Sequence, residues 1–200
     1  MRVHVVHAHP VETSFSRTLF ETTIAALKEA GHEVDPCNLY DEGFEAVMSR
    51  EERLEYHEVP ENITPAIAPY VERLRAADAL VFVHPVWNYG YPAILKGYFD
   101  RVYVPGVSFV LIGGEANDRG KLVPNLKNIK KVAYVTHYGG DRLRTMLMGD
   151  PPRRLARRWA WAMFGSWLPP KYLALYNIDN CTQAQREGFI AKVRRTMLSF

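Results

Sequence analysis

The sequence predicts a doubly wound α/β fold in which five parallel strands, in the order 2-1-3-4-5, carry helices on both faces. Short apolar, β-branched stretches alternate with helical patterns five times along the chain, which is typical of a parallel sheet with crossover helices. The stretch 79–83 contains no polar residue, as expected of a parallel strand buried on both faces. The 200 residues show no internal repeat and have the length of one domain, so we expect a single domain over residues 1–200.

The individual elements follow from apolar periodicity and from the residues that begin or end helices. The predicted strands are residues 3–6, 32–39, 79–83, 131–136 and 172–176. The second strand should lie at an edge of the sheet, because Pro36 cannot donate a hydrogen bond within a central ladder. The predicted helices are residues 14–30, 69–77, 92–104, 141–167 with a break at Pro151 and Pro152, and a last helix opened by a capping box at Thr182 and Gln185. The remaining long segments are 41–65, a loop or small insertion, and 107–123, an extended loop or hairpin.

Composition excludes several classes of protein. The net charge of +3 is too balanced for nucleic acid as the main ligand, and no run approaches the ~20 apolar residues of a membrane span. Cys37 and Cys181 match no zinc or redox spacing, and the N-terminus lacks the pattern of a signal peptide, so we expect a cytoplasmic protein. His4, His7 and His9 alternate along a strand, so at most two of them can converge and no metal site is expected.

A sheet of this kind binds ligands at the carboxyl ends of its strands, between the first and third strands. The loops at this position are residues 8–16, 84–91 and 136–141, all rich in polar and aromatic residues. Hydroxyls at Thr13, Ser14 and Ser16 stand at the start of a helix, whose free N–H groups form a cradle for a phosphate. The alternative is that Thr13 or Ser14 is only a helix cap. We expect His9 to donate a hydrogen bond to a phosphate or hydroxyl of the ligand.

The second loop opens the longest motif in the chain. Its residues are Pro85-x-Trp87-x-x-Gly90-x-Pro92-Ala93-x-Leu95-Lys96-Gly97-x-x-Asp100-Arg101-Val102, followed by Gly106-x-x-Phe109. This run closely resembles the flavodoxin-like NAD(P)H:quinone oxidoreductases, which include the DT-diaphorase type and the ancillary flavoproteins of bacterial potassium-efflux systems. The first loop is similar to that family's His…Ser-Phe-Asn motif, with Ser16 in place of Asn, and residues 136–140 resemble its Thr-Thr-Gly-Gly motif with an inserted aromatic residue. The resemblance covers residues 1–140.

The resemblance implies a flavodoxin-like flavin-binding domain with a tightly bound flavin, FAD or FMN. It assigns the phosphate to Thr13, Ser14, Phe15 and Ser16, the isoalloxazine edge to Pro85, Val86, Trp87, Asn88 and Tyr89, and the pyrimidine end to the third loop, with Thr136, Gly139 and Gly140. We expect FAD rather than FMN, because the segments 106–124 and 137–168 give extra chain to cover an adenosine.

The resemblance also implies the reaction. NAD(P)H would deliver a hydride to the flavin, the nicotinamide would leave, and a quinone or similar acceptor would take two electrons at the same face, a ping-pong mechanism. Members of the family are typically homodimers with the active site at the subunit interface. The tryptophan-rich stretch 159–167 is a candidate for that interface.

One departure from the family concerns the catalytic residues. The mammalian members carry a Tyr and a His five and eleven residues after the Gly-Gly pair, and these positions hold Thr145 and Pro151 here. Tyr138 and His137, inside the third loop, are the candidates to replace them as catalytic residues. The alternative is that both only line the pocket, because the flavin needs no obligatory protein acid.

Other interpretations stay open at this stage. The arginines of segment 141–168 are either a solvated basic face, a clamp for a cofactor phosphate, or, together with the tryptophans, a surface for a dimer partner or a lipid quinone. For the whole chain, the alternatives to an enzyme are a flavin-binding regulatory subunit of a potassium-efflux system and a flavodoxin-type electron carrier. The positive net charge counts against a carrier, since such carriers are usually acidic.

Overall fold

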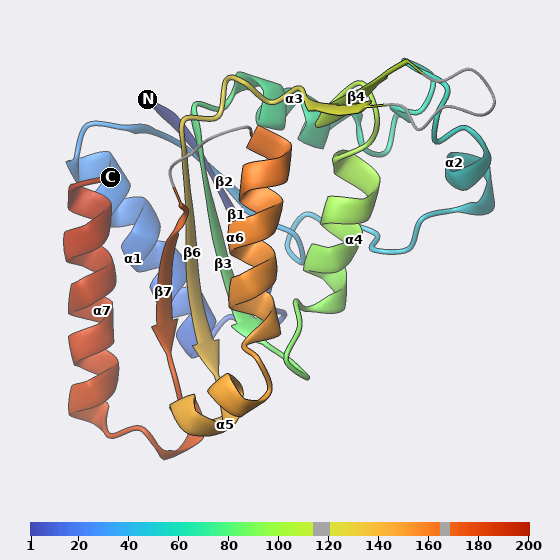
Figure 1. Ribbon diagram of the computed structural model, residues 1–200. Coiled ribbons are helices and arrows are strands. Elements are labelled where there is room, and N and C mark those ends of the chain that lie inside the picture. The colour runs from blue at the N-terminus through green and yellow to red at the C-terminus, as the bar shows by residue number, and fades with distance from the viewer. Residues whose placement is uncertain (114–120, 165–168) are drawn as a thin grey trace.

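In the computed structural model, five parallel strands form one sheet in the order β2-β1-β3-β6-β7 (Figure 1). The structure describes residues 1–113, 121–164 and 169–200. The strands are β1 (Arg2–His7), β2 (Glu33–Asn38), β3 (Ala79–Val86), β6 (Lys131–Tyr138) and β7 (Lys171–Leu175). The predicted fold class and strand order are confirmed, and β2, the strand with Pro36, lies at an edge.

Helices cover both faces of the sheet (Figure 1). On one face lie α1 (Phe15–Glu29) and α7 (Gln183–Leu198), and on the other lie α3 (Ala68–Ala76), α4 (Ala93–Val102) and α6 (Pro151–Phe164). The predicted 107–123 segment forms a hairpin in the part that is described, with β4 (Phe109–Ile112) antiparallel to β5 (Lys121–Pro124). The short helices α2 (Arg50–Leu54) and α5 (Arg142–Leu147) and the 3-10 turn η1 (Ile178–Asn180) complete the chain.

Local sequence explains where the long helices begin. The Ser14 hydroxyl caps α1 by accepting from the Arg17 N–H, and the predicted capping box of Thr182 and Gln185 opens α7. Helix α1 buries one stripe of side chains against the sheet, including Leu19. This stripe fixes the position of the helix N-terminus over the end of β1.

Two strands are longer than the sequence suggested. β3 continues through His84, Pro85 and Val86, and β6 continues through Tyr138, because these residues still pair with one another in register. Pro85 is tolerated in this central strand because the register of β3 with β1 ends at Val83, so β3 has only one strand neighbour beyond that point. The second and third ligand loops therefore begin on rigid strand ends.

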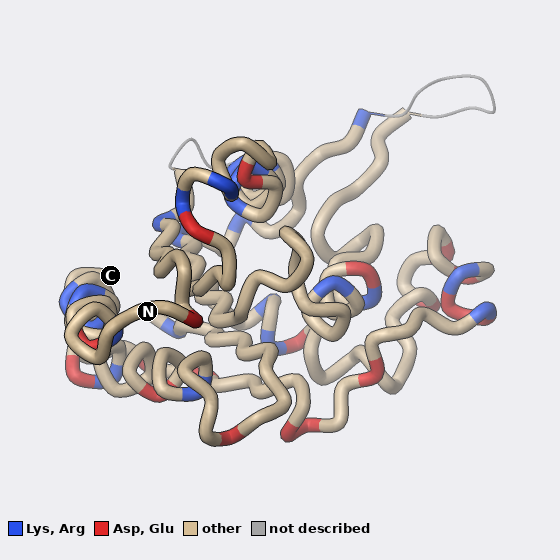
Figure 2. The backbone as a smooth tube through the Cα atoms, turned by 90° about the horizontal axis from the view of Figure 1, so that it is seen from below, with Lys and Arg blue, Asp and Glu red and all other residues tan. Residues whose placement is uncertain are grey.

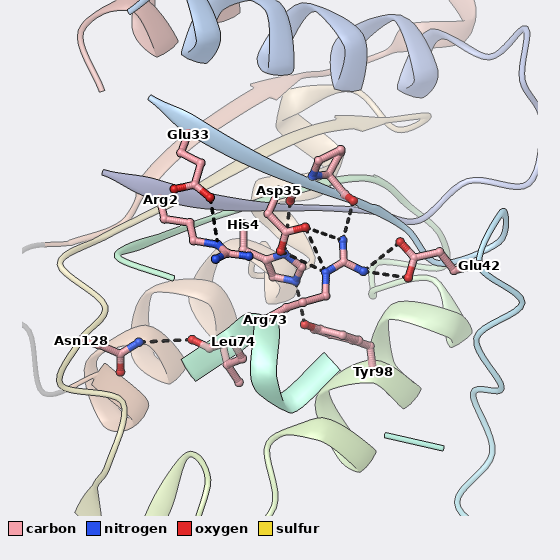
Figure 3. Close-up of polar contacts among 10 residues, drawn as sticks. Arg2, His4, Glu33, Asp35, Glu42, Arg73, Leu74, Tyr98 and Asn128 are labelled. Atoms are coloured by element: carbon pink, nitrogen blue, oxygen red, sulfur yellow. Dashed lines mark hydrogen bonds and ion pairs between the residues drawn. The ribbon is translucent and has the colours of Figure 1, made fainter. Parts of the chain in front are cut away.

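A network of paired polar groups lies at the edge of the sheet beside β2 (Figure 3). The fully buried His4 bonds through Nδ1 to the Asp35 carboxylate at 2.9 Å and through Nε2 to the Tyr98 hydroxyl at 3.1 Å. Arg73 donates three hydrogen bonds to the Asp35 carboxylate, at 2.9, 3.0 and 3.1 Å, and also donates to Glu42. Within the described ranges, no three His, Cys, Asp or Glu side chains are grouped so that they could hold a metal ion.

Candidate functional site

The three predicted ligand loops meet at the carboxyl end of the sheet. Three contacts join them in pairs: the His9 and Trp87 rings with centroids 5.8 Å apart, the Phe15 and His137 rings also at 5.8 Å, and the Tyr89 hydroxyl placed over Gly140. Each loop therefore touches both others. The predicted position at the switch point between β1 and β3 brings together residues that are more than 120 apart in sequence.

The first loop offers hydrogen-bond donors at the start of α1. Ser14 accepts from the Arg17 N–H at 3.1 Å, which leaves its own hydroxyl hydrogen free to donate. Thr13 is exposed, whereas Ser16 is fully buried and its hydroxyl bonds His7 at 3.2 Å. A contact from Ser16 to a ligand must therefore come from its backbone N–H, which lies in the first turn of the helix, where there is no intrahelical acceptor.

His9 is suited to the donor role expected of it. Its Nδ1 accepts from the Val11 N–H at 3.1 Å, so in the neutral ring the proton sits on Nε2. Burial lowers the pKa of His9 below its ordinary value, which favours this neutral form. Its ring stands beside Trp87, between the first and second loops.

The second loop is a tight turn set on the end of β3. Trp87 and Gly90 exchange backbone hydrogen bonds of 3.2 and 2.8 Å. Between them Asn88 and Tyr89 have left-handed φ values of 49° and 56°, the geometry of a two-residue hairpin turn. A left-handed tyrosine is unusual and is typical of a functional loop. The Trp87 side chain is 42% exposed, so it is not a core residue.

Side chains from two other loops closely approach the two glycines of the third loop. A Cβ atom on Gly140 would lie 3.3 Å from the Tyr89 hydroxyl, and one on Gly139 would lie 3.1 Å from a carboxylate oxygen of Asp179. Asp179 belongs to η1, in the loop that follows β7, which our sequence reasoning did not assign to the site. The signal was available, because this loop also leaves the carboxyl end of a strand.

Buried polar atoms without partners lie at the same end of the sheet. They are His7 Nδ1, His84 Nε2, Thr136 Oγ1 and His137 Nε2, none of which has a hydrogen-bond partner in the part of the chain that is described. His84 and Thr136 are fully buried and face each other in register on β3 and β6. His84 Nδ1 donates to the Pro85 carbonyl at 2.8 Å, so its Nε2 is left as an acceptor. An unsatisfied buried group costs about 1–3 kcal/mol. Comparable unpartnered atoms also lie elsewhere in the described core, on Thr23, Asn62 and Tyr103, so these atoms do not by themselves indicate a ligand.

His84 and His137 are both neutral at pH 7. Burial lowers the pKa of His84 to about 4. Burial also lowers the pKa of His137 to about 4, with a further contribution from the charges of His84 and His9. Neutral imidazoles can donate or accept a hydrogen bond to an uncharged ring system without repelling it.

The two predicted catalytic residues are placed differently. His137 faces the first loop through Phe15. Tyr138 is buried, and its hydroxyl donates to Asp150 at 2.8 Å and contacts the Tyr172 hydroxyl at 2.6 Å. Burial, together with these neighbours, raises the pKa of Tyr138 far above its ordinary value. The structure thus places His137 where the three loops meet, which we call the loop cluster. The Tyr138 hydroxyl, by contrast, is already hydrogen-bonded to Asp150 and Tyr172.

A cavity of about 570 Å³ lies beside the loops, between α4, α6 and the segment around α2. Its aromatic lining consists of Tyr56, Tyr91, Phe99, Tyr103, Phe109 and Trp159. The Trp159 ring packs 4.7 Å from Phe99, so this tryptophan is used within the chain. The Trp161 side chain and Trp167, which we expected at a subunit interface, lie outside what the structure describes.

Comparison with known proteins gives the same picture. Residues 1–158 match the family described as having the flavodoxin-like fold. The chain is 30% identical over 148 residues to the uncharacterized NAD(P)H oxidoreductase YcaK of Escherichia coli, covering 74% of this chain and 69% of that protein. It is 33% identical over 147 residues to the FMN-dependent NADH:quinone oxidoreductase of Bacillus velezensis, covering 67% and 66%.

The match to the mammalian relatives is shorter. The chain is 34% identical over 125 residues to rat NAD(P)H dehydrogenase [quinone] 1, covering 54% of this chain and 45% of that protein. Among solved structures, the NAD(P)H:quinone oxidoreductase of Methanothermobacter marburgensis superimposes with a TM-score of 0.82 at 26% identity, covering 100% of this chain and 96% of that chain.

Proposed function

The chain belongs to the flavodoxin-like fold family, and from this premise we propose that it is a flavin-dependent NAD(P)H oxidoreductase that reduces quinones or similar acceptors by two electrons. The observation that supports this most is the meeting of the three loops at the switch point. Relatives named as quinone oxidoreductases agree with the proposal.

We propose FMN as the flavin. The Bacillus velezensis relative carries FMN in its name. The FAD that we expected from the length of two connecting segments depended partly on residues 114–120 and 165–168, which lie outside the described ranges. The phosphate would be held by Thr13, Ser14 and the first amides of α1, and the ring would lie against Trp87 and Tyr89.

The protein's own part in the chemistry is to bind, orient and hold protons. Bound FMN supplies the two-electron transfer between a nicotinamide and a quinone. The backbone of Gly139 and Gly140 would approach the cofactor closely because no Cβ intervenes, whereas His84 Nε2 and Thr136 Oγ1 are fully buried and are not positioned to contact it. His137, with a pKa of about 4, would remain a neutral hydrogen-bonding partner.

The rest of the proposal follows the family resemblance. The two substrates would use one face of the ring in turn, a ping-pong order, and the chain would act as a single domain in a cytoplasmic homodimer. Tyr138 stays a candidate only for an indirect role, since its hydroxyl is bonded to Asp150. Light scattering tests the dimer, and parallel initial-rate lines for the two substrates test the order.

The decisive experiment is reconstitution. Purified apoprotein is mixed separately with FMN and FAD, and bound flavin and NAD(P)H oxidation with a water-soluble benzoquinone are measured. We expect retention of FMN and turnover with the quinone. If neither flavin binds and no NAD(P)H is oxidised, the proposed function is wrong.

A further inference from the structure

Helix α5 exposes almost all of its apolar side chains. Leu143, Met146, Leu147 and Met148 are each more than half exposed, Leu147 reaching 77%, and Thr145 is the one residue of the helix that is buried. Single exposed apolar residues are common on soluble proteins, but four within six positions form a patch. Nothing in the described part of the chain covers this patch.

The neighbouring helix adds positive charge without negative charge. Arg154, Arg157 and Arg158 are exposed on α6, and Arg142 and Arg144 are exposed on α5. Two acidic residues stand beside these arginines: Asp141, whose carboxylate pairs with Arg144 at 3.2 Å, and Asp150, which accepts a hydrogen bond from Tyr138. Figure 2 views the molecule from this end and marks the arginines of α5 and α6 in blue. We call the four apolar side chains and the three α6 arginines the α5–α6 face.

This face adjoins the mouth of the candidate site. α5 begins two residues after Gly140, and its cap, Asp141, binds the Arg144 N–H at 2.9 Å. Val11 and Trp87, from the first and second loops, are also exposed at this end of the sheet, at 47% and 42%. A surface that binds α5 therefore lies next to the place where an acceptor would enter.

Charge decides between the possible partners. A second copy packed two-fold on the same face would bring two surfaces of net positive charge together, which is unfavourable even though each arginine need not meet its own copy. A merely solvated basic face has no need of exposed leucine and methionine. Arginines beside exposed Leu and Met side chains are typical of segments that lie in the interface of an anionic bilayer, and no helix of the described residues is long and apolar enough to cross one.

We propose that the α5–α6 face docks on the surface of an anionic lipid bilayer and that the acceptors are quinones dissolved in that bilayer. The choice of acceptor rests on the proposed function; the docking does not. The four apolar side chains enter the headgroup region, the arginines bind lipid phosphates, and the loop cluster then faces the membrane.

The test is sedimentation of the full chain with vesicles of phosphatidylcholine, with and without phosphatidylglycerol, at low and high salt. We expect binding only to the anionic vesicles, weakened by salt. Leu147→Glu with Met146→Glu should abolish it, whereas Val47→Glu with Leu54→Glu, equally exposed residues elsewhere, should leave it intact. Equal binding of both variants, or no binding of the wild type, overturns the proposal.

The arginines give a graded second measurement. Neutralising Arg154, Arg157 and Arg158 to Gln one at a time should weaken vesicle binding about fivefold per residue, whereas Lys192→Gln and Arg195→Gln on α7 should have little effect. If Leu147→Glu instead converts a dimer to a monomer and wild-type vesicle binding is absent, the face is a self-interface and the proposal is wrong. Turnover with a water-soluble benzoquinone, measured in parallel, shows whether the proposed function stands regardless of the vesicle result.

Discussion

Two fully buried histidines on neighbouring strands of the same sheet have opposite surroundings. His4, on β1, is bonded at both ring nitrogens, to Asp35 and Tyr98. His84, on β3, is bonded at Nδ1 and has no partner at Nε2 in the described structure. Burial alone is therefore no sign of function. The two histidines differ in whether their polar atoms have partners within the chain, a difference that also occurs in the core, as at Tyr103 and Tyr134.

The physical meaning differs accordingly. The His4 network connects β1, β2, α3 and α4 and so holds the edge of the sheet together (Figure 3). At the carboxyl end, His84 and Thr136 are fully buried and leave hydrogen bonds unmade, which lowers the stability of the protein. The paired network at the β2 edge thus stabilises the fold, the loops at the carboxyl end form the candidate binding site, and each assignment can be tested separately.

The largest effect is expected from Arg73→Met, which breaks the paired network. The substitution leaves the Asp35 carboxylate with His4 alone and should lower the free energy of unfolding by about 4 kcal/mol, because it strips a partly buried charge of its partner. Urea unfolding measures this. Arg194→Met, which removes an exposed pair with Glu29, should cost about 0–1 kcal/mol. Equal losses in the two variants would show that the network is not structural.

The next effect is the pH dependence of stability that arises from the lowered pKa of His84. His84 has a pKa of about 4 in the folded protein against 6.5 ordinarily, so below pH 6.5 the unfolded chain takes up a proton that the folded chain does not. Stability should therefore fall as the pH drops from about 6.5 to about 4, by a total on the order of 3 kcal/mol for this residue. Urea midpoints across this pH range measure the slope.

His84→Asn is the matched variant, since its amide can still donate to the Pro85 carbonyl and cannot titrate. It should reduce the slope between pH 6.5 and 4 by the share of His84, while the shares of His7 and His137, whose pKa values burial also lowers to about 4, remain. His57→Asn, on the exposed segment near α2, should leave the slope as it is. Asp35 acts in a different window. Although burial opposes it, hydrogen bonds from His4 and Arg73 hold the pKa of Asp35 below its usual range, so its stabilisation is lost only below about pH 4. An unchanged slope in His84→Asn contradicts the assignment.

A smaller effect is expected from Trp87→Ala, which removes aromatic area from the loop cluster. The turn of residues 87–90 is held by backbone bonds, so it should survive the substitution. Flavin binding should weaken by about 2 kcal/mol with little change in the melting temperature of the apoprotein. Fluorescence titration and thermal melting measure the two quantities. Trp159→Ala, by contrast, should lower stability by about 3 kcal/mol, because that ring packs on Phe99 and Tyr103.

Sequence patterns predicted most of the scaffold. Strand order, the edge position of the Pro36 strand and the caps at Ser14 and Thr182 were predicted correctly, because each depends on local periodicity or on a residue with few conformations. The sequence predicted that β3 and β6 end at residues 83 and 136, whereas they continue to Val86 and Tyr138. Cross-strand pairing extends them, and no local pattern in the sequence encodes that pairing.

The sequence predicted which three loops form the site, but not the directions of their side chains or their hydrogen-bond partners. The direction of the Tyr138 hydroxyl depends on Asp150 and Tyr172, which lie 12 and 34 positions away in the sequence. His84 Nε2 is left as an acceptor because the other ring nitrogen, Nδ1, donates to the Pro85 carbonyl. The residue types in the sequence do not predict this hydrogen bond. Side-chain direction and hydrogen-bond accounting required the three-dimensional structure.

The smallest and most specific effect is expected from Ser14→Ala, because Ser14 belongs to both kinds of region at once. Its hydroxyl oxygen caps α1, and its hydroxyl hydrogen is free for a phosphate. Thr182→Ala is the matched control: it removes the equivalent cap of α7, so both variants should lose about 1 kcal/mol of stability. Only Ser14→Ala should weaken FMN binding, about tenfold for one lost charge-assisted bond, and it should leave riboflavin, which has no phosphate, unaffected. Titrating both flavins against both variants therefore isolates the phosphate contact from the loss of helix stability. Equal weakening of FMN and riboflavin in Ser14→Ala would place the phosphate elsewhere and reduce Ser14 to a helix cap.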